Sequence, residues 1–353
     1  MANKRKTIAL LFMVMSVLLI VSACSSKIEE PKNEPVSKTE FVLGTVATIK
    51  IYDDVDTSVK EDVFNKVFSR LREVEDKMTI NAESSEVISI NSNAGKDFIK
   101  VSEDTLYVIK RGKYFSEISK GRFDISIGPL VKLWNIGTEE AKVPSKEEIE
   151  DKKALVDYNK VVLNEADSEV ILKDEGMVLD LGGIAKGYGA DAVVEILKEN
   201  NIKHAIINLG GNVFAYGNKI DGTPWKVGVQ NPKSSRGEYL GIAKVVNQTV
   251  VTSGIYERFF EEEGNRYHHI LDTDTGYPVE NNLTGVSIIA DSSIDADSLS
   301  TAVFALGLEE GMKFIEEIDT ADAVFVTKDS EVYVTSGLKE KFELTDSNFK
   351  LVE

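Results

Sequence analysis

Apolar residues recur at helical spacing in several separate parts of the chain. In residues 57–77, Val63, Val67, Leu71 and Val74 form one stripe with charged residues between them. Side chains three or four positions apart share one face of a helix, so this stripe predicts an amphipathic helix against a core. Similar patterns predict a helix after Lys186, through Ala190, Val193, Val194 and Leu197, and helices over residues 103–118, 296–306 and 310–317.

Short β-rich segments lie between these predicted helices. Strands and helices interleave without the regular strand–helix–strand alternation of a doubly wound sheet. The pattern therefore predicts an α+β fold, in which mixed sheets pack against helices, and it shows no internal repeat. We expect strands within residues 41–52, 161–163, 169–172, 204–209, 225–229, 241–246 and 285–290, and a hairpin over residues 323–335.

The first residues of the chain have the pattern of a bacterial lipoprotein signal peptide. Basic residues 4–6 precede an apolar run over residues 8–21, which is short for a helix that crosses a bilayer. Small residues then lead to Cys24, as in a lipobox, where the cysteine becomes the lipid-carrying N-terminus. We therefore expect a signal peptide over residues 1–23 and a mature protein anchored by lipid to the extracytoplasmic face of the membrane. Cys24 is the only cysteine, so no intramolecular disulfide forms.

A polar, proline-containing segment follows the cysteine. Residues 24–38 are expected to form a flexible tether, and residues 39–353 one catalytic unit with room for two lobes. The formal net charge is −18, and removal of three basic residues with the signal makes it more negative. So acidic a chain argues against nucleic-acid binding. A phosphate ligand would need local help from a metal ion, a lysine or backbone N–H groups.

Residues 180–191, DLGGIAKGYGAD, form the motif with the clearest chemical content. Asp180, a double glycine and Lys186 lie where an apolar segment that resembles the end of a buried strand meets the predicted helix. Glycine lets a backbone approach a ligand closely, and a helix N-terminus attracts anions. The spacing matches neither the dinucleotide-binding motif nor the Walker motif. The alternative is a glycine-rich turn whose lysine extends along the surface.

Other segments each admit a functional and a structural interpretation. In residues 121–134, Asp124 stands in an apolar run and needs either a ligand or local donors. Residues 208–212 (NLGGN) and 252–258 (TSGIYER) place small residues after β-rich runs, where a flat ligand could approach, but both also suit ordinary loops. Residues 267–279 hold two adjacent histidines, candidates for a general base, a phosphate contact or a structural hydrogen bond. In a strand, these two point to opposite faces.

Asp297 and Thr301 lie four residues apart in the predicted helix that opens near Ile294. This spacing puts a carboxylate and a hydroxyl on one helical face, where they could hold Mg²⁺ together with phosphate and water. The alternative is helix capping by Asp295 or Asp297. No cysteine–histidine cluster with zinc spacing and no G-x-S-x-G motif is present in the sequence.

Taken in order, these segments resemble the ApbE family of FAD:protein FMN transferases. The resemblance covers nearly everything after the tether and includes LGTVATI, GRFDISIGPLVKLW, DLGGIAKGYGAD, HHILDTDTGYPV and DADSLSTAVFALG. It implies an ApbE-like, T-fold-related domain that takes FAD as substrate with Mg²⁺, or else Ca²⁺, as cofactor. It also implies transfer of FMN to a threonine hydroxyl of an extracytoplasmic acceptor protein, with release of AMP.

The resemblance also assigns roles to residues. It implies that Gly183, Asp297 and Thr301 hold the metal ion and that His269 is the reactive histidine, while His268 lies outside the motif. The FAD-binding residues implied in the same way are Leu43, Asn81, Arg122, Phe123, Asp124, Asp180, Lys186 and Ile270.

Two positions depart from the family pattern. Leu43 stands where many members have methionine, which conserves apolar packing. Asn81 stands where many members have tyrosine, and relatives with asparagine there hydrolyse FAD to FMN and AMP beside or instead of transfer. The alternatives to a transferase are therefore an FAD pyrophosphatase and a lipid-anchored flavin-binding protein.

Overall fold

The computed structural model describes residues 35–235 and 237–352. These residues belong to one compact unit, which begins at Pro35. The predicted signal peptide and Cys24 lie outside the described residues. No helix in the described ranges is long and apolar enough to span a membrane.

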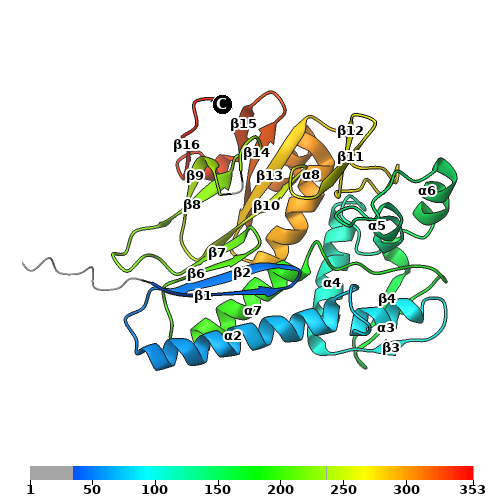
Figure 1. Ribbon diagram of the computed structural model, residues 1–353, viewed down its shortest axis with the longest axis horizontal. Coiled ribbons are helices and arrows are strands. Elements are labelled where there is room, and N and C mark those ends of the chain that lie inside the picture. The colour runs from blue at the N-terminus through cyan, green and yellow to red at the C-terminus, as the bar shows by residue number, and fades with distance from the viewer. Residues whose placement is uncertain (1–34, 236, 353) are drawn as a thin grey trace, which may run out of the picture. The chain divides into compact units, whose positions relative to one another are not determined.

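A nine-stranded sheet runs through the molecule (Figure 1). Hydrogen-bonded neighbours are antiparallel except for the last pair, β15 and β17, which is parallel. The mixed sheet that the sequence predicts is therefore present. In sheet order, the strands are β1 (Val36–Val42), β2 (Thr45–Ile51), β6 (Ala205–Leu209), β7 (Asn212–Tyr216), β10 (Gln248–Gly254), β13 (Leu283–Ala290), β14 (Ala321–Thr327), β15 (Glu331–Val334) and β17 (Lys350–Leu351).

Three long helices cover one face of this sheet. Helices α2 and α7 share a core with β1, β2 and β6, which includes Val63, Val67 and Leu71 of the predicted stripe. Helix α8 packs on β10, β13 and β14. These helices are α2 (Thr57–Met78), α7 (Ala185–Glu199) and α8 (Ser293–Glu316).

A smaller sheet covers the opposite face of β10, β13 and β14. Alternate residues of β14 show this plainly, because Ala323 and Phe325 pack toward α8 whereas Val324 and Val326 pack toward the small sheet. Side chains of a strand alternate between faces, so the central strands are buried on both sides. The small sheet consists of β16 (Phe342–Leu344), β9 (Tyr239–Val245) and β8 (Trp225–Gln230).

The other α-helices and short strands lie around α4 and α5 (Figure 1). They supply the loops that face α7 and α8. They are α3 (Glu86–Ser92), β3 (Ile99–Lys100), α4 (Glu103–Ile118), α5 (Gly128–Trp134), α6 (Lys146–Lys153), β4 (Val161–Asn164), β5 (Glu169–Leu172), β11 (Phe259–Glu262) and β12 (Asn265–His268).

Three expectations need correction. The tether is shorter than predicted, because β1 begins at Val36 and its inward side chains pack on α2. The segment before the glycine turn is not a strand: only Val178 makes an isolated bridge, and the N–H of Leu179 donates to a side chain, Asn91 Oδ1, at 2.7 Å. Helix α8 starts earlier than residue 296, and its two predicted parts meet at a break at Gly307 (φ 79°).

Candidate active site

The N-terminal turns of α7 and α8 approach each other unusually closely. A Cβ on Gly187 would lie 2.3 Å from the carbonyl oxygen of Ser293, so only glycine fits there. At this contact the N–H of Gly187 donates to Asp297 Oδ2 at 2.9 Å. The glycine therefore lets a helix N-terminus bind a carboxylate of the neighbouring helix.

Asp191 and Arg111 hold the start of α8 in place. Asp191 accepts hydrogen bonds from the backbone N–H groups of Ser293 (2.8 Å) and Ile294 (2.9 Å). Burial raises the pKa of Asp191 to about 6, although these bonds oppose the rise. Arg111 of α4 forms a two-pronged ion pair with Asp295 at 2.7 and 2.6 Å. Both interactions fix the helix that carries Asp297.

Asp297 and Lys186 form the charged centre of the site. Lys186 Nζ lies 3.3 and 3.4 Å from the two carboxylate oxygens and also donates to the carbonyl oxygen of Gly182 at 3.1 Å. Only 5% of the Asp297 side chain is exposed, against 28% of Lys186. A lysine and an aspartate 111 positions apart are thus paired at the glycine turn.

The three residues predicted to bind a metal ion come together. A Cβ on Gly183 would lie 3.8 Å from Thr301 Oγ1, and Thr301 is one helical turn from Asp297. The described residues contain no cluster of three or more His, Cys, Asp or Glu placed to hold a metal ion. A carboxylate, a hydroxyl and a backbone carbonyl nevertheless fit a hard cation that takes its other ligands from phosphate and water.

Asp180 shapes the glycine turn from within. Its Oδ1 accepts from the N–H of Gly182 at 2.7 Å, and its own N–H donates to the carbonyl oxygen of Ile125 at 2.8 Å. Burial raises the pKa of the Asp180 carboxyl, while Arg258 and Lys186 favour its charged form. Asp180 therefore joins the glycine turn to the loop of residues 121–127.

In that loop, Asp124 has the structural role that the sequence left open. Its Oδ1 accepts from the N–H and the hydroxyl of Ser126, both at 2.7 Å, and its Oδ2 from the N–H of Tyr158 at 3.2 Å. Phe123 instead faces the site, because a Cβ on Gly183 would lie 3.0 Å from its ring. A contact between FAD and the Asp124 carboxylate stays a prediction.

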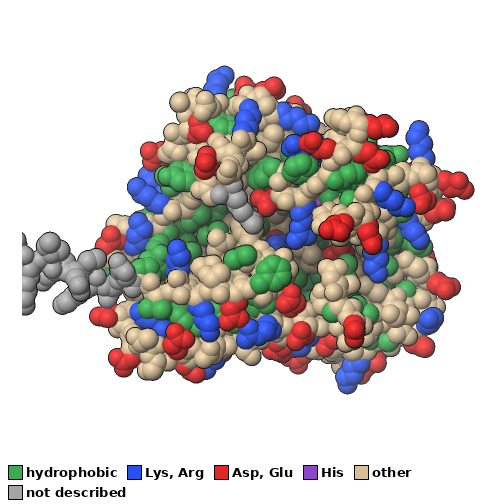
Figure 2. All heavy atoms as spheres, in the orientation of Figure 1, with side chains coloured by type: hydrophobic (Ala, Val, Ile, Leu, Met, Phe, Trp, Pro, Cys, Tyr) green, Lys and Arg blue, Asp and Glu red, His purple; other side chains and the backbone are tan. Residues whose placement is uncertain are grey.

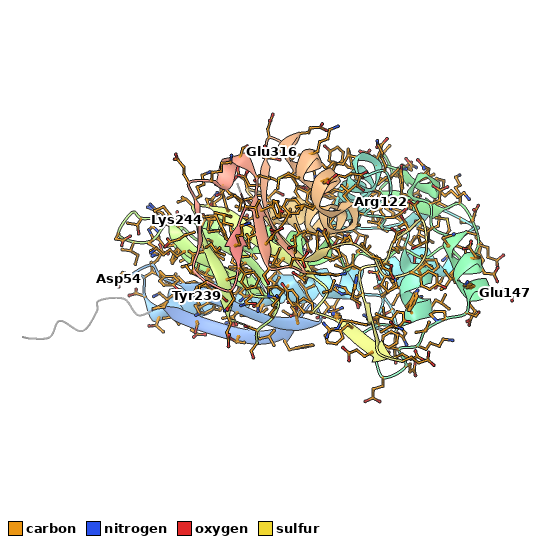
Figure 3. All side chains as sticks on the ribbon, turned by 90° about the horizontal axis from the view of Figure 1, so that it is seen from above. Asp54, Arg122, Glu147, Tyr239, Lys244 and Glu316 are labelled. Carbon is orange, nitrogen blue, oxygen red and sulfur yellow. The ribbon has the colours of Figure 1, made fainter. Side chains whose placement is uncertain are left out.

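Arg122 is bound to the aspartate-rich loop after the histidines. It lies 3.1 Å from Asp272 and 3.0 Å from Asp274. Figure 3 shows Arg122 in the half of the molecule that carries α4 and α5, away from Tyr239 and Lys244 of β9. The loop of residues 272–276 thereby holds residues 121–123 beside the glycine turn.

The two histidines have separate environments, as expected for neighbours in an extended segment. His268 is buried, and its Nε2 lies 3.0 Å from the carbonyl oxygen of Val279. His269 is half-buried, and its Nδ1 lies 3.3 Å from the carbonyl oxygen of Arg258. A carbonyl only accepts, so Nδ1 carries the proton and Nε2 is left as a base. Ile270, beside them, is buried.

Burial lowers the pKa of His269 to about 4, and the charges of Arg258, His268 and Lys186 contribute to this change. The imidazole is therefore neutral at neutral pH. A neutral imidazole with a free Nε2 is the form that can take a proton from a hydroxyl group.

Leu43 and Asn81 lie on two separate loops. Leu43 is at the tip of the β1–β2 hairpin with φ 55°, and its Cδ1 lies 2.9 Å from where a Cβ on Gly189 would be. Asn81 is exposed in the loop between α2 and α3. In Figure 2 the molecular face is hollowed near its centre, close to the hairpin tip, with basic and acidic side chains around the hollow.

Comparison with known proteins decides the family. The model of the ApbE family matches residues 43–325. The chain belongs to the ApbE family. It is 36% identical over 321 residues to an FAD:protein FMN transferase of Klebsiella pneumoniae strain 342, with 91% of this chain and 98% of that protein covered. It is 33% identical over 351 residues to an FAD:protein FMN transferase of Treponema pallidum strain Nichols, with 96% of each covered.

Solved structures agree with this membership of the ApbE family. The ApbE protein of Thermotoga maritima has a TM-score of 0.80 and 30% identity, covering 87% of this chain and 99% of its own. The flavinyl transferase ApbE of Pseudomonas stutzeri, in apo form, has a TM-score of 0.78 and 28% identity, covering 89% and 98%. The ApbE-like α+β fold is thereby confirmed.

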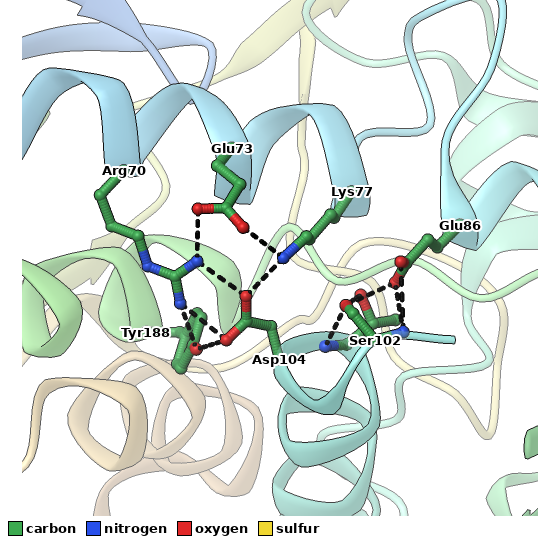
Figure 4. A network of polar contacts seen from close by, with 8 residues as sticks. Arg70, Glu73, Lys77, Glu86, Ser102, Asp104 and Tyr188 are labelled. Atoms are coloured by element: carbon green, nitrogen blue, oxygen red, sulfur yellow. Dashed lines mark hydrogen bonds and ion pairs between the residues drawn. The ribbon is translucent and has the colours of Figure 1, made fainter. Parts of the chain in front are cut away.

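Figure 4 shows a polar network that supports this ApbE site and that no sequence motif predicted. Asp104, at the start of α4, accepts two hydrogen bonds from Arg70 (2.7 and 2.6 Å), one from Lys77 (2.7 Å) and one from the hydroxyl of Tyr188. These hydrogen bonds from Arg70 are the main reason why the pKa of Asp104 is lowered. Because Tyr188 follows Lys186 by two residues, the network fixes the first turn of α7 against α2 and α4.

The NLGGN segment, by contrast, is a simple hairpin turn. Gly210 and Gly211 have φ values of 63° and 101° between β6 and β7. A Cβ on Gly210 would lie 2.0 Å from Thr45 Oγ1. Its glycines thus serve strand reversal and close strand packing, as the ordinary-loop interpretation holds.

Proposed function

We propose that this chain is an FAD:protein FMN transferase that joins the FMN part of FAD to a threonine hydroxyl of an acceptor protein. The activity is the one named for the full-length relatives. The observation that carries the proposal for this chain is the Lys186–Asp297 pair at the glycine turn, with Thr301 one helical turn further on. A cation, a buried carboxylate and backbone N–H groups meet there in a chain of net charge −18.

In this proposal, Asp297, Thr301 and the carbonyl of Gly183 would hold a divalent cation, Mg²⁺ or Ca²⁺. When bound, such an ion supplies Lewis-acid polarisation of a phosphoryl oxygen. Lys186 neutralises negative charge on the diphosphate, and the glycine turn lets the backbone approach it. Phe123, Leu43 and Ile270 supply apolar surface for the flavin.

His269 acts as the base. The threonine oxygen attacks the phosphorus of the FMN half, the P–O bond of the anhydride breaks, and AMP leaves with the bridging oxygen. The hydroxyl proton passes to Nε2 of His269, because Nδ1 donates to the carbonyl oxygen of Arg258. The lowered pKa of His269 keeps this nitrogen unprotonated before the reaction.

We also propose that the mature protein is attached by lipid at Cys24 to the extracytoplasmic face of the membrane. The support is the sequence pattern of residues 1–24 alone. An acceptor on a secreted or membrane protein would then lie in the same compartment.

The test is incubation of the full chain with FAD, Mg²⁺ and an acceptor protein bearing a threonine flavinylation motif. Intact-protein mass spectrometry should show an FMN phosphoester on the acceptor. The Asp297→Asn variant should form none, and an acceptor with that threonine changed to valine is the matched substrate control. FAD binding without any adduct on the wild-type acceptor would refute the transferase.

A second candidate, FAD pyrophosphatase, is favoured by the exposed Asn81. A small polar side chain leaves room for water where a large ring would exclude it. This activity predicts AMP and free FMN from FAD and Mg²⁺ without any acceptor. Chromatography of the products, with and without acceptor, separates the two reactions.

A further inference from the structure

Arg258 differs from the other described arginines in its ion pairing. It makes no ion pair with any carboxylate in residues 35–235 and 237–352, although the chain has 59 acidic residues. An unpaired arginine in so acidic a protein is available for an anionic ligand. Each other described arginine has a partner: Arg70 pairs with Asp104, Arg72 with Glu40, Arg111 with Asp295, Arg122 with Asp272, and Arg266 with Glu261.

The backbone and the side-chain stem of Arg258 are nevertheless held in place. Its carbonyl oxygen accepts from the N–H of His269 at 3.1 Å and lies 3.3 Å from His269 Nδ1. Its Cδ lies 3.6 Å from where a Cβ on Gly137 would be, so the stem passes over the turn after α5. The residue as a whole is exposed. The guanidinium is thus an accessible cation on a fixed support.

The charge of Arg258 acts on two residues of the site. It favours the charged form of the Asp180 carboxyl and the neutral form of the His269 imidazole. Asp180 is in the glycine turn and His269 is the proposed base, so the charge of Arg258 acts on both residues. In the proposed reaction, the phosphorus attacked by the acceptor hydroxyl lies between these two residues.

We propose that the guanidinium of Arg258 binds the phosphate that stays with the flavin. The inference rests on the proposed function, and it assigns Arg258 a binding role beside Lys186. Guanidinium groups bind phosphate oxygens through two parallel hydrogen bonds, whereas an ammonium acts as a point charge. Arg258 therefore recognises the phosphoryl group that is transferred and leaves the isoalloxazine ring to the apolar residues.

Binding of FMN and of riboflavin, which lacks the phosphate, tests this directly. Flavin fluorescence titrations are made with wild type, Arg258→Gln and Arg258→Lys. Arg258→Gln should weaken FMN binding by about tenfold to a hundredfold, as expected for a lost charge-assisted hydrogen bond, and leave riboflavin binding unchanged. Arg258→Lys should fall between wild type and Arg258→Gln.

Arg266→Gln is the matched control, because Arg266 is a nearby exposed arginine that is paired with Glu261 at 2.9 Å. It should leave both affinities unchanged. Equal weakening of FMN and riboflavin by Arg258→Gln, or no weakening of either, would overturn the inference. Circular dichroism establishes that each variant is folded, and Arg258→Lys supplies the comparison if Arg258→Gln is not.

The result is distinguishable from failure of the proposed function. Adduct formation by the wild type tests the transferase, whereas the FMN–riboflavin comparison needs no acceptor and no turnover. If the wild type forms the adduct and Arg258→Gln binds FMN as well as the wild type does, only the role of Arg258 is refuted.

Discussion

Two residues of the site are defined by their surroundings. The imidazole of His269 is neutral because burial and nearby positive charges disfavour the imidazolium ion. The carboxyl oxygens of Asp297 accept hydrogen bonds from Lys186 and from the N–H of Gly187. In the proposed function, a base on a loop and an anion on α8 are thereby kept apart within one site. This separation lets one residue accept a proton while the other binds positive charge.

The pH dependence of the reaction should reflect His269. Its pKa is lowered from 6.5 to about 4, so the base stays unprotonated as the pH falls from 8 to 5. We therefore expect protonation of His269 to cause no decrease in kcat/KM between pH 8 and pH 5. Below about pH 4, kcat/KM should decrease tenfold per pH unit. Steady-state rates at FAD concentrations below KM measure this. An acid limb centred near 6.5 would contradict it.

The same shift has a consequence for stability. A histidine whose pKa is lowered on folding contributes stability above its unfolded pKa, and this contribution is lost as the pH falls through the folded pKa. For His269 the loss occurs between about pH 6.5 and 4. The difference in Tm between wild type and His269→Gln should therefore change in this interval and be constant above pH 7.5.

Replacement of Asn81 by tyrosine should reduce hydrolysis relative to transfer. Asn81 is exposed. In the proposed function, its small side chain leaves one side of the flavin open, whereas a tyrosine ring would stack on the flavin and exclude water. We expect AMP release without acceptor to fall several-fold and FAD affinity to rise by tenfold or less, as stacking contributes about 0.5–1.5 kcal/mol. The products are separated by chromatography. Ser84→Tyr, in the same exposed loop, is the control, and unchanged hydrolysis in Asn81→Tyr would refute this role.

At the scale of elements, the site depends on how closely α7 and α8 approach. Gly187 allows the contact, Asp191 caps α8, and the Asp104 network holds α7 from the other side. The metal-binding residues predicted for this site come from the glycine turn before α7 and from the second and third turns of α8. A change in helix separation therefore displaces Gly183 from Asp297 and Thr301.

Gly187→Ala should destabilise the protein and weaken metal binding together. The added Cβ would lie 2.3 Å from the carbonyl oxygen of Ser293, so the helices must move apart. Overpacking of this kind costs about 1–3 kcal/mol. Urea unfolding measures the loss, and titration of Mg²⁺ in the presence of FAD measures the affinity. Glu195→Ala, exposed on the same helix, should change neither quantity, and an unaffected Gly187→Ala would show that the close contact is dispensable.

Long elements could be predicted from the sequence because their burial is periodic. Val63, Val67, Leu71 and Val74 are all fully buried in α2, as the stripe indicates. Helices α3 and α5 have seven residues each and α6 has eight, so their patterns span too few turns to be recognised. The strand expected before Asp180 is absent, since the partners of that segment are a loop and the Asn91 side chain.

The candidate site, too, could be predicted from the sequence only in part. Its residues were found because motifs from 43 to 301 occur in family order, although the pairing of Lys186 with Asp297 joins positions 111 apart. The sequence is compatible with two roles for Asp124, binding a ligand or accepting local hydrogen bonds. The hydrogen bonds from Ser126 and Tyr158 in the folded chain show the structural role. The unpaired state of Arg258 depends on the positions of all nearby carboxylates, which no local pattern contains.

For the whole molecule, the excess of negative charge couples substrate binding to cation binding. The formal net charge is −18, and a diphosphate adds to it. The attraction supplied by Lys186 is shared with Asp297, so one lysine does not offset this repulsion. FAD and a divalent cation should therefore bind cooperatively.

Thermal unfolding should show this coupling. FAD with Mg²⁺ should raise Tm by more than the sum of the two separate shifts, because each ligand binds the folded state better when the other is present. At about 100 times Kd a ligand adds about 2.7 kcal/mol, or about 5 °C in a domain of this size. EDTA should reduce the FAD shift to its metal-free value, and KCl at matched ionic strength should not replace Mg²⁺.

In the Asp297→Asn variant, the extra shift in Tm should disappear while FAD alone still stabilises the protein. Strictly additive shifts in the wild type would show that the cation and the nucleotide bind at independent places.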